Sequence, residues 1–217
     1  MVTDPKSYWE KDDFAHPYQM GPQKHRIYLL NLLRKKGVES ILDVGCGTGP
    51  IYNLLIEQAR QDETPMMFDY KGTDYSRTMI ETCKELFPEG NFEVQDMRRL
   101  KEPDSSWGCV LLMHALDHTN DYKAAIKEAA RVSDRYVCIV LWRPFVDKET
   151  NMNTNPFYGR EEGTGPWEEP NYLQEYSREV LETEFMRNNL VIEEEAGGDD
   201  LNSDQSGYNH LFLCRKL

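Results

Sequence analysis

The sequence lacks any long apolar run. The longest, Tyr136–Trp142, is far shorter than the roughly 20 residues that a membrane-spanning helix needs. The polar, acidic N-terminus, MVTDPKSYWEKDD, contains no apolar signal core. These absences predict a protein that does not enter a membrane and that stays in the cytoplasm.

Cysteine is sparse, and its arrangement excludes two kinds of site. The five cysteines are an odd number, and no two of them have C-x-x-C spacing. Cys109, Cys138 and Cys214 lie inside apolar, strand-like runs. This pattern predicts buried free thiols in a reducing compartment, with neither a disulfide framework nor a metal site.

Basic residues are too few to balance the acidic ones, so the formal net charge is −13. Such a surface repels a polyanion, and we expect no nucleic-acid partner. The densest basic runs, 24–26 and 34–36, are interpreted as the solvated face of one helix. The charge balance weakly favours a neutral or cationic substrate over an anionic one.

The sequence does contain a regular alternation of strand and helix patterns. Strand patterns occupy seven segments: 39–44, 66–73, 91–95, 107–113, 135–142, 190–196 and 208–215. Helical patterns occupy 24–36, 50–60, 76–87, 122–132 and 173–188, with Ser76, Asp121 and Ser177 as expected N-caps. The alternation predicts a doubly wound α/β fold whose mostly parallel sheet ends in an antiparallel strand and carries helices on both faces.

The strongest motif follows the first of these strands, where residues 41–49 read ILDVGCGTG. Glycines let the backbone turn tightly and let a ligand lie directly against it. The next helix, which Pro50 begins, would point its N–H groups at an anionic group. A dinucleotide site would read G-x-G-x-x-G, and a P-loop would continue into G-K-S/T, so the motif matches neither.

This motif resembles that of the class I S-adenosylmethionine-dependent methyltransferase family, and the resemblance covers about residues 40–142. It implies a Rossmann-like fold, S-adenosylmethionine as cofactor and S-adenosylhomocysteine as product. Asp74 would accept the ribose hydroxyls, and Asp96 would meet the adenine amine beside Met97. The cofactor-binding residues that the resemblance implies are Asp43, Gly45, Cys46, Gly47, Gly49, Asp74, Tyr75, Asp96, Met97 and His114.

Two histidines follow the fourth strand in MHALDH, which resembles the family's H-x-L-D/E-H segment. His114 or His118 could act as a general base toward a substrate hydroxyl or amine. Alternatively, His118 braces the following helix and His114 lines the cofactor pocket without moving a proton. Methyl transfer from a sulfonium can depend on positioning alone, so both interpretations stay open.

We expect one methyltransferase domain over residues 1–217. Residues 1–38, an aromatic segment and a helix, would lie over the cofactor; alternatively, the aromatic segment packs on the edge of the sheet. Residues 143–171, rich in proline, glycine and aromatics, would form an inserted substrate lid. Trp142, Arg143 and Phe145 would face the same crevice.

The sequence therefore predicts methyl transfer from S-adenosylmethionine to an oxygen or nitrogen atom of a small-molecule acceptor. One alternative is a methyltransferase that acts on a protein or a tRNA. Another is a protein that binds S-adenosylmethionine without turnover, because the binding motif and the chemistry are separable. We expect a monomer or a weak homodimer.

Overall fold

The computed structural model describes residues 23–142, 145, 150–152, 173–197, 201 and 209–217. These residues contain a seven-stranded sheet of order β3-β2-β1-β4-β5-β9-β8. Its strands are β1 (Ser40–Val44), β2 (Asp69–Asp74), β3 (Phe92–Val94), β4 (Trp107–Met113), β5 (Ser133–Leu141), β8 (Leu190–Gly197) and β9 (His210–Lys216). All neighbours pair in parallel except β9, which is antiparallel to both β5 and β8.

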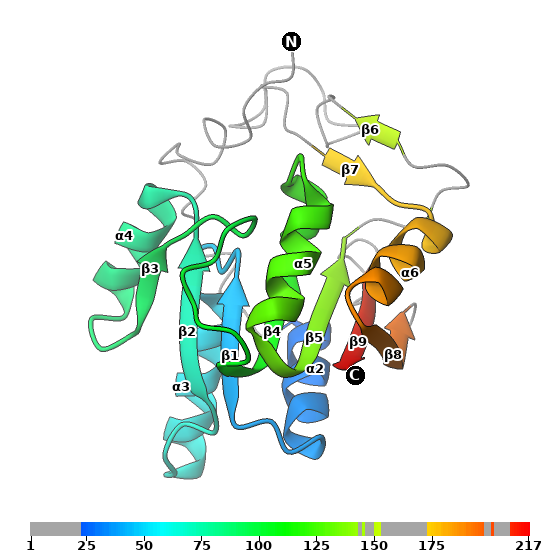
Figure 1. Ribbon diagram of the computed structural model, residues 1–217. Helices are drawn as coiled ribbons and strands as arrows, with labels where there is room; N and C mark the ends of the chain where they lie inside the picture. Colours follow the sequence, from blue (N-terminus) through cyan, green and yellow to red (C-terminus); the bar gives the residue numbers. More distant parts are fainter. Residues whose placement is uncertain (1–22, 143–144, 146–149, 153–172, 198–200, 202–208) are drawn as a thin grey trace, which may run out of the picture.

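Helices cover both faces of this sheet (Figure 1). They are α2 (Lys24–Lys35), α3 (Pro50–Asp62), α4 (Arg77–Leu86), α5 (Tyr122–Val132) and α6 (Arg178–Arg187). In the view of Figure 1, α2 and α3 lie behind the sheet, whereas α5 and α6 lie in front of it. The predicted Rossmann-like, doubly wound fold with one antiparallel strand is confirmed. No helix among the described residues has the length and apolar character to span a bilayer.

The alternation of side chains along each strand builds the core in two halves. Cys109 and Leu111 of β4 share a buried cluster with Leu33 of α2. Val110, between them in sequence, belongs instead to the cluster that contains Ile126 of α5. A strand that is buried on both faces reads as a continuous apolar run, which is how β4 reads. All five cysteines are buried and free, which confirms the predicted thiols.

Three helices begin where the sequence predicts a capping side chain. Ser76, Asp121 and Ser177 each accept a hydrogen bond from the backbone N–H three residues later, at 3.3, 3.0 and 3.3 Å. The last of these caps limits the helix predicted over residues 173–188, because α6 begins only after Ser177. Leu173–Glu175 is a strand, β7, that pairs with β6 (Thr150–Met152). The strand predicted from residue 66 likewise begins later, at Asp69.

The prediction that the basic residues of α2 form a solvated face is partly wrong. Lys24 is exposed, but His25 and Arg26 are only 2% and 6% exposed. His25 precedes Leu29 by four residues and Arg26 precedes Leu30 by four, so both share the helix face that carries the buried leucines. The first turn of α2 therefore brings two polar side chains into the interior.

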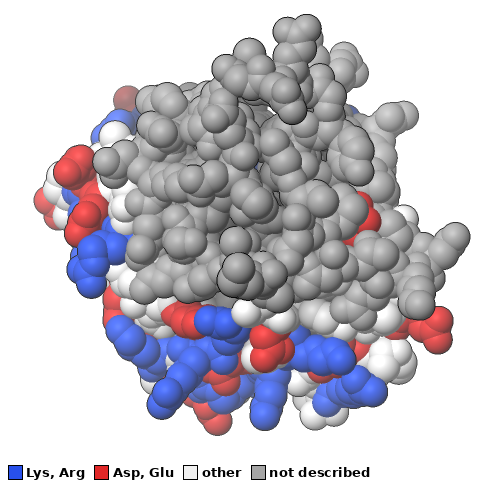
Figure 2. Space-filling model, turned by 90° about the horizontal axis from the view of Figure 1, so that it is seen from above, with Lys and Arg blue, Asp and Glu red and all other residues white. Residues whose placement is uncertain are grey.

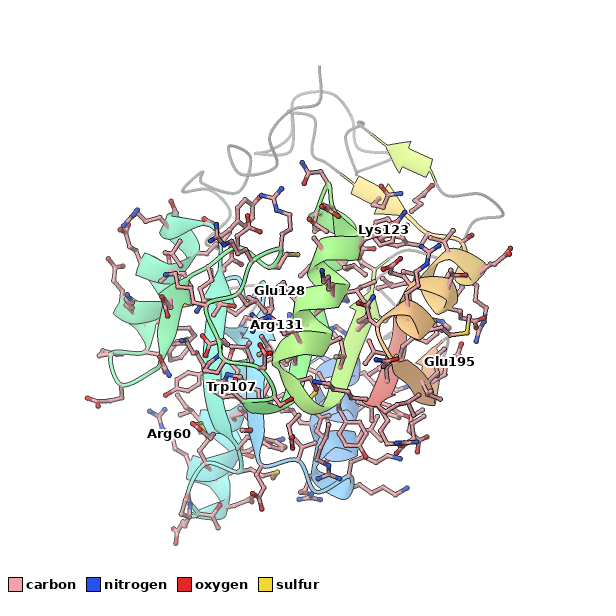
Figure 3. The ribbon with its side chains drawn as sticks, viewed as in Figure 1. Arg60, Trp107, Lys123, Glu128, Arg131 and Glu195 are labelled. Carbon is pink, nitrogen blue, oxygen red and sulfur yellow. The ribbon has the colours of Figure 1, made fainter. Side chains whose placement is uncertain are left out.

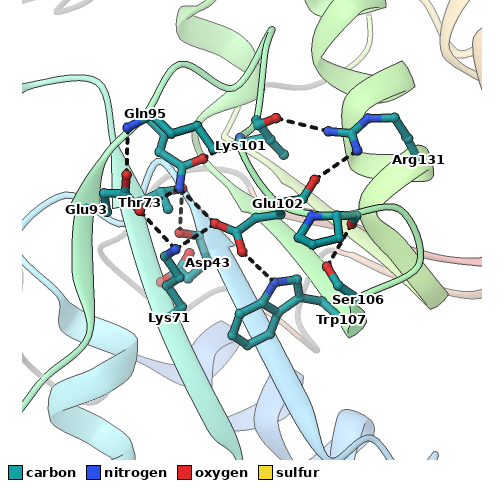
Figure 4. A network of polar contacts seen from close by, with 12 residues as sticks. Asp43, Lys71, Thr73, Glu93, Gln95, Lys101, Glu102, Ser106, Trp107 and Arg131 are labelled. Carbon is teal, nitrogen blue, oxygen red and sulfur yellow. Dashed lines mark hydrogen bonds and ion pairs between the residues drawn. The ribbon is translucent and has the colours of Figure 1, made fainter.

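The connection between β3 and β4, residues 95–106, contains no helix and is fixed by ion pairs (Figure 4). Lys71 of β2 binds Glu102 at 2.7 Å and Glu93 at 3.0 Å. Glu102 also accepts a hydrogen bond from Trp107 Nε1 at 3.1 Å. On the side of α5 that faces this segment (Figure 3), Arg131 donates to the carbonyl of Glu102 at 2.9 Å. Ion pairs and hydrogen bonds of charged side chains, rather than the packing of a helix, thus fix this segment.

We expect Glu102→Ala to lower the free energy of unfolding by about 2–3 kcal/mol, because it leaves Lys71 without its better-buried partner. The side chains of Lys71 and Glu102 are only 14% and 10% exposed. Urea unfolding measures the change. Glu89→Ala, at an exposed position, serves as control and should stay within about 0.5 kcal/mol of the wild type. Equal midpoints for the two variants would contradict a stabilising role for the network.

Candidate functional site

The candidate site lies at the carboxyl ends of the parallel strands, where β1 continues into α3 through the glycine turn. Gly45, Gly47 and Gly49 have φ angles of 79°, 54° and 82°. The N–H groups of Gly45 and Cys46 donate to the carbonyl of Thr73 in β2 at 2.7 and 3.0 Å. These left-handed conformations explain why the turn is built from glycine.

The ends of neighbouring strands meet around Gly45. A Cβ atom at Gly45 would lie 2.5 Å from the Cβ of Ala115, which follows β4, and 3.9 Å from Cε of Met97, which follows β3. Asp74, the last residue of β2, accepts a hydrogen bond from the N–H of Gly47 at 3.0 Å. Open α/β sheets bind ligands in the crevice at this edge. The structure therefore brings Gly45, Gly47, Asp74 and Met97 together, as the sequence predicts.

Asp43 lies below the turn and contacts a strand neighbour. Its side chain is 2% exposed, and its Oδ2 accepts a hydrogen bond from the Tyr70 hydroxyl at 2.7 Å. Burial raises the pKa of Asp43 to about 7, although Tyr70 and Arg26 act in the opposite direction. Asp43 thus supports the turn from within the sheet, and its predicted contact with the cofactor stays a prediction.

Asp74 and Asp96 differ in their exposure. Asp74 is 9% exposed and accepts a second hydrogen bond, from Ser76 N–H at 2.9 Å. Burial raises the pKa of Asp74, against the effect of these N–H donors. The Asp96 side chain is 41% exposed and pairs with Arg98, with Nη2 and Oδ2 separated by 2.6 Å. Because each carboxylate oxygen has two lone pairs, both acids keep the capacity for the predicted ribose and adenine contacts.

Cys46 and Tyr75 are placed differently relative to the turn. Cys46 is 3% exposed, and burial raises the pKa of its thiol. The Cys83 thiol donates to the Gly47 carbonyl at 3.1 Å, which braces the turn from α4. Tyr75, next to Asp74, is half-buried. We expect Cys46 to meet a cofactor through backbone atoms.

His114 leaves β4 in an unusual conformation, with φ of 53°. Left-handed backbone is uncommon for residues other than glycine and often occurs at functional sites. Its N–H donates to the Val140 carbonyl at 2.8 Å, and its Nε2 lies 2.7 Å from Oδ1 of Asn209. Burial lowers the pKa of His114 to about 4. His118 ends the short 3-10 helix Leu116–His118 and is half-buried.

Two polar residues that the sequence did not predict lie beside His114. The ring centroid of His25 lies 5.0 Å from that of His114, and Asn209 is 1% exposed. The four-residue spacing between His25 and Leu29 is a signal that could have identified His25. No sequence signal pointed to Asn209, because its place depends on the insertion of β9 beside β5.

Phe145 packs beside β9, and its predicted place in the crevice stays a prediction. Its ring packs against His210 and Phe212, with centroid distances of 4.8 and 5.8 Å, on the side of the sheet that α6 covers. The Trp142 N–H donates to Oδ2 of Asp117 at 3.1 Å. Residues 1–22 and most of the expected lid, residues 143–171, lie outside the described residues. Those predictions therefore stay untested.

Comparisons with known proteins find a family match over part of the chain. Residues 41–135 match a protein family described as "methyltransferase domain". An O-methyltransferase from Pyrenophora dematioidea is 26% identical over 132 residues, which are 58% of this chain and 47% of that protein. The chain thus spans about half the length of that curated relative.

Two solved structures share the fold. Magnesium protoporphyrin IX methyltransferase from Synechocystis, solved with bound S-adenosylmethionine, has a TM-score of 0.65 at 16% identity and covers 100% of this chain and 99% of its own. A methyltransferase from Methanosarcina mazei has a TM-score of 0.61 at 17% identity and covers 83% of this chain and 93% of its own. At these identities the likeness concerns the fold alone. Residues 41–135 thus match the methyltransferase-domain family, and the chain has the fold of solved S-adenosylmethionine-dependent methyltransferases.

Proposed function

We propose that this protein transfers a methyl group from S-adenosylmethionine to an oxygen or nitrogen atom of a small molecule. The observation that carries the proposal is the meeting of four strand ends around Gly45, with the Asp74 carboxylate tied to Gly47. The relative named an O-methyltransferase and the fold neighbour solved with S-adenosylmethionine support it.

The residues present fit the cofactor in three places. The first turn of α3 has no capping side chain, which leaves N–H groups for the carboxylate of the methionine moiety. Asp74, at the end of β2, would accept the ribose hydroxyls, and Met97 would contact the adenine. Because Gly45 has no Cβ, the backbone between Asp74 and Met97 would be accessible to the cofactor. When bound, the cofactor would supply a methyl group already activated by a sulfonium.

We also propose that the enzyme works in the cytoplasm, as a monomer or weak homodimer, since buried free thiols suit a reducing compartment. Seen from above, Lys and Arg side chains gather along one edge of the described surface with Asp and Glu among them (Figure 2). The formal net charge of the sequence is nevertheless −13, which disfavours a nucleic acid and favours a small acceptor over tRNA. We keep residues 1–38 and 143–171 as the proposed cover of the cofactor and the proposed substrate lid of a single domain.

We expect Asp74→Ala to weaken S-adenosylhomocysteine binding by about 1.5–3 kcal/mol, the range for hydrogen bonds to a charged group. Calorimetry measures the affinity. Asp69→Ala is the matched control, because Asp69 is an exposed acid at the opposite end of the same strand. Unchanged affinity in the Asp74 variant would refute its assignment to the ribose.

A second measurement tests the activity itself. The purified protein is incubated with labelled S-adenosylmethionine and a cell extract that is then split into small-molecule and macromolecular fractions. Label in the small-molecule fraction, with formation of S-adenosylhomocysteine, is the expected result. Label confined to macromolecules would favour a protein or tRNA acceptor, and no product at all would favour a binding protein without turnover.

A further inference from the structure

His25, in the first turn of α2, is a buried polar side chain that the proposed cofactor contacts do not use. It is 2% exposed, and neither Nδ1 nor Nε2 has a hydrogen-bond partner among the described residues. Buried polar atoms in folded proteins nearly always have a partner, so an exception calls for an explanation. A ligand that supplies the missing hydrogen bond is one such explanation.

The position of His25 links it to the candidate site. Its ring lies 5.0 Å from the ring of His114, at an interplanar angle of 49°. His114 is the residue before Ala115, which occupies the space that a Cβ of Gly45 would need. The two imidazoles therefore lie beside the glycine turn, on the β4 side of it, whereas Asp74 and Met97 follow strands on its other side.

Asn209 fixes the orientation of one of these rings. It precedes β9, whose start lies beside the end of β5 because Leu141 pairs with His210. Its Oδ1 lies 2.7 Å from Nε2 of His114. Nδ1 is therefore the nitrogen of His114 that can contact the substrate that receives the methyl group. The side chains of His25, His114 and Asn209 thus form one polar cluster, although they come from α2, the end of β4 and the start of β9, which are distant in sequence.

Burial, assisted by neighbouring charges, keeps both rings neutral. Burial lowers the pKa of His25 to about 3 and that of His114 to about 4. Arg26 disfavours protonation of both rings, and the two histidines His114 and His118 act in the same direction. A neutral imidazole offers one lone pair and one N–H, so it accepts a hydrogen bond from a hydroxyl and gives no ion pair to an ammonium or a carboxylate.

We propose that His25 and His114 form the acceptor-binding part of the site, with Asn209 as a positioning residue, and that the acceptor is a neutral hydroxyl of the phenol or enol class. This proposal rests on the proposed function. So weak a base does not remove a proton from an ordinary alcohol, which is why an acidic hydroxyl fits best. As the acceptor oxygen bonds to the methyl carbon, its proton passes to an imidazole nitrogen and the electrons of the broken carbon–sulfur bond stay on sulfur.

The test measures binding of simple probes to the protein saturated with S-adenosylhomocysteine. Phenol is the hydroxyl probe, anisole lacks only the proton, and benzoate and benzylamine carry opposite charges. Nuclear magnetic resonance of isotope-labelled histidine follows the rings of His25 and His114 directly. We expect phenol to shift both rings and to bind at least tenfold more tightly than the other three probes.

Variants then assign the binding to His25. His25→Phe keeps a planar ring but has no nitrogen, and we expect it to bind phenol at least tenfold more weakly, with a smaller change in its affinity for S-adenosylhomocysteine. His210→Phe is the matched control, because that ring pairs with Glu195 at 2.8 Å and packs against Phe145. It should bind phenol as the wild type does. If His25→Phe fails to fold, the wild-type comparison of phenol with anisole still tests whether the site recognises the hydroxyl proton.

Several outcomes would overturn the proposal. They are equal binding of phenol and anisole, tighter binding of benzoate or benzylamine, unchanged phenol affinity in His25→Phe, and absence of phenol binding in the wild type. The proposed function fails separately, if the wild-type protein does not bind S-adenosylhomocysteine in the calorimetric titration.

Discussion

Replacing Gly45 with alanine is expected to lower the free energy of unfolding by about 2–5 kcal/mol and to abolish binding of S-adenosylhomocysteine. The left-handed backbone, with φ of 79°, costs an alanine about 1–2 kcal/mol. The added Cβ would also lie 2.5 Å from the Cβ of Ala115, and relieving such overpacking costs about 1–3 kcal/mol more. Any relief displaces Ala115 or the turn itself, which is where the cofactor is proposed to bind.

Gly37→Ala separates these two contributions. Gly37 has a similar φ of 66°, but a Cβ there would meet no atom within 4 Å. We expect this control to lose only about 1–2 kcal/mol and to bind S-adenosylhomocysteine normally. Urea unfolding and calorimetry on both variants provide the comparison. Equal losses of stability would mean that the contact with Ala115 relaxes without cost.

Asp43→Asn is expected to change how stability depends on pH. The pKa of Asp43 is about 7 in the folded protein, whereas an unfolded chain has about 3.9. The folded state therefore holds the proton more tightly. The contribution is fully present below the unfolded pKa and is lost as the pH rises through the folded pKa, by about 4 kcal/mol in all. Asparagine does not titrate and still accepts the Tyr70 hydrogen bond.

The measurement is the free energy of unfolding of both proteins at a series of pH values between about 4 and 8, the range in which the carboxyl changes its charge. Relative to Asp43→Asn, the wild type should lose stability steadily as the pH rises. His25 and His114 have lowered pKa values and destabilise the protein as the pH falls, which is the opposite direction. Both variants contain these histidines, so their effect cancels in the difference. Parallel curves would show that Asp43 does not hold its proton.

Local features of the sequence predicted most of the fold. Capping residues such as Ser76 act through a hydrogen bond to the third residue after them, so short-range chemistry suffices to identify them. The glycine turn is similarly local, because positive φ angles are a property of single residues. The helix predicted over residues 173–188 was too long because Leu173–Glu175 forms a strand only by pairing with the distant residues 150–152.

The proposed acceptor-binding residues His25 and Asn209 could not be predicted from such local features of the sequence. Asn209 is near His114 in space but 95 positions away in sequence, and only the strand order brings them together. His25 looked like part of a charged surface because Lys24 and Arg26 flank it. Its burial results from the packing of α2 against the sheet, and the four-residue spacing to Leu29 is the local sign of it.

The insertion of β9 between β5 and β8 has a consequence for how the chain matures. β9 is synthesised after both of its neighbours, so during translation each of them presents an unpaired edge. Open strand edges with apolar faces are prone to pair with other chains. We therefore expect a nascent chain that ends within the segment before β9 to be the species that most needs a chaperone.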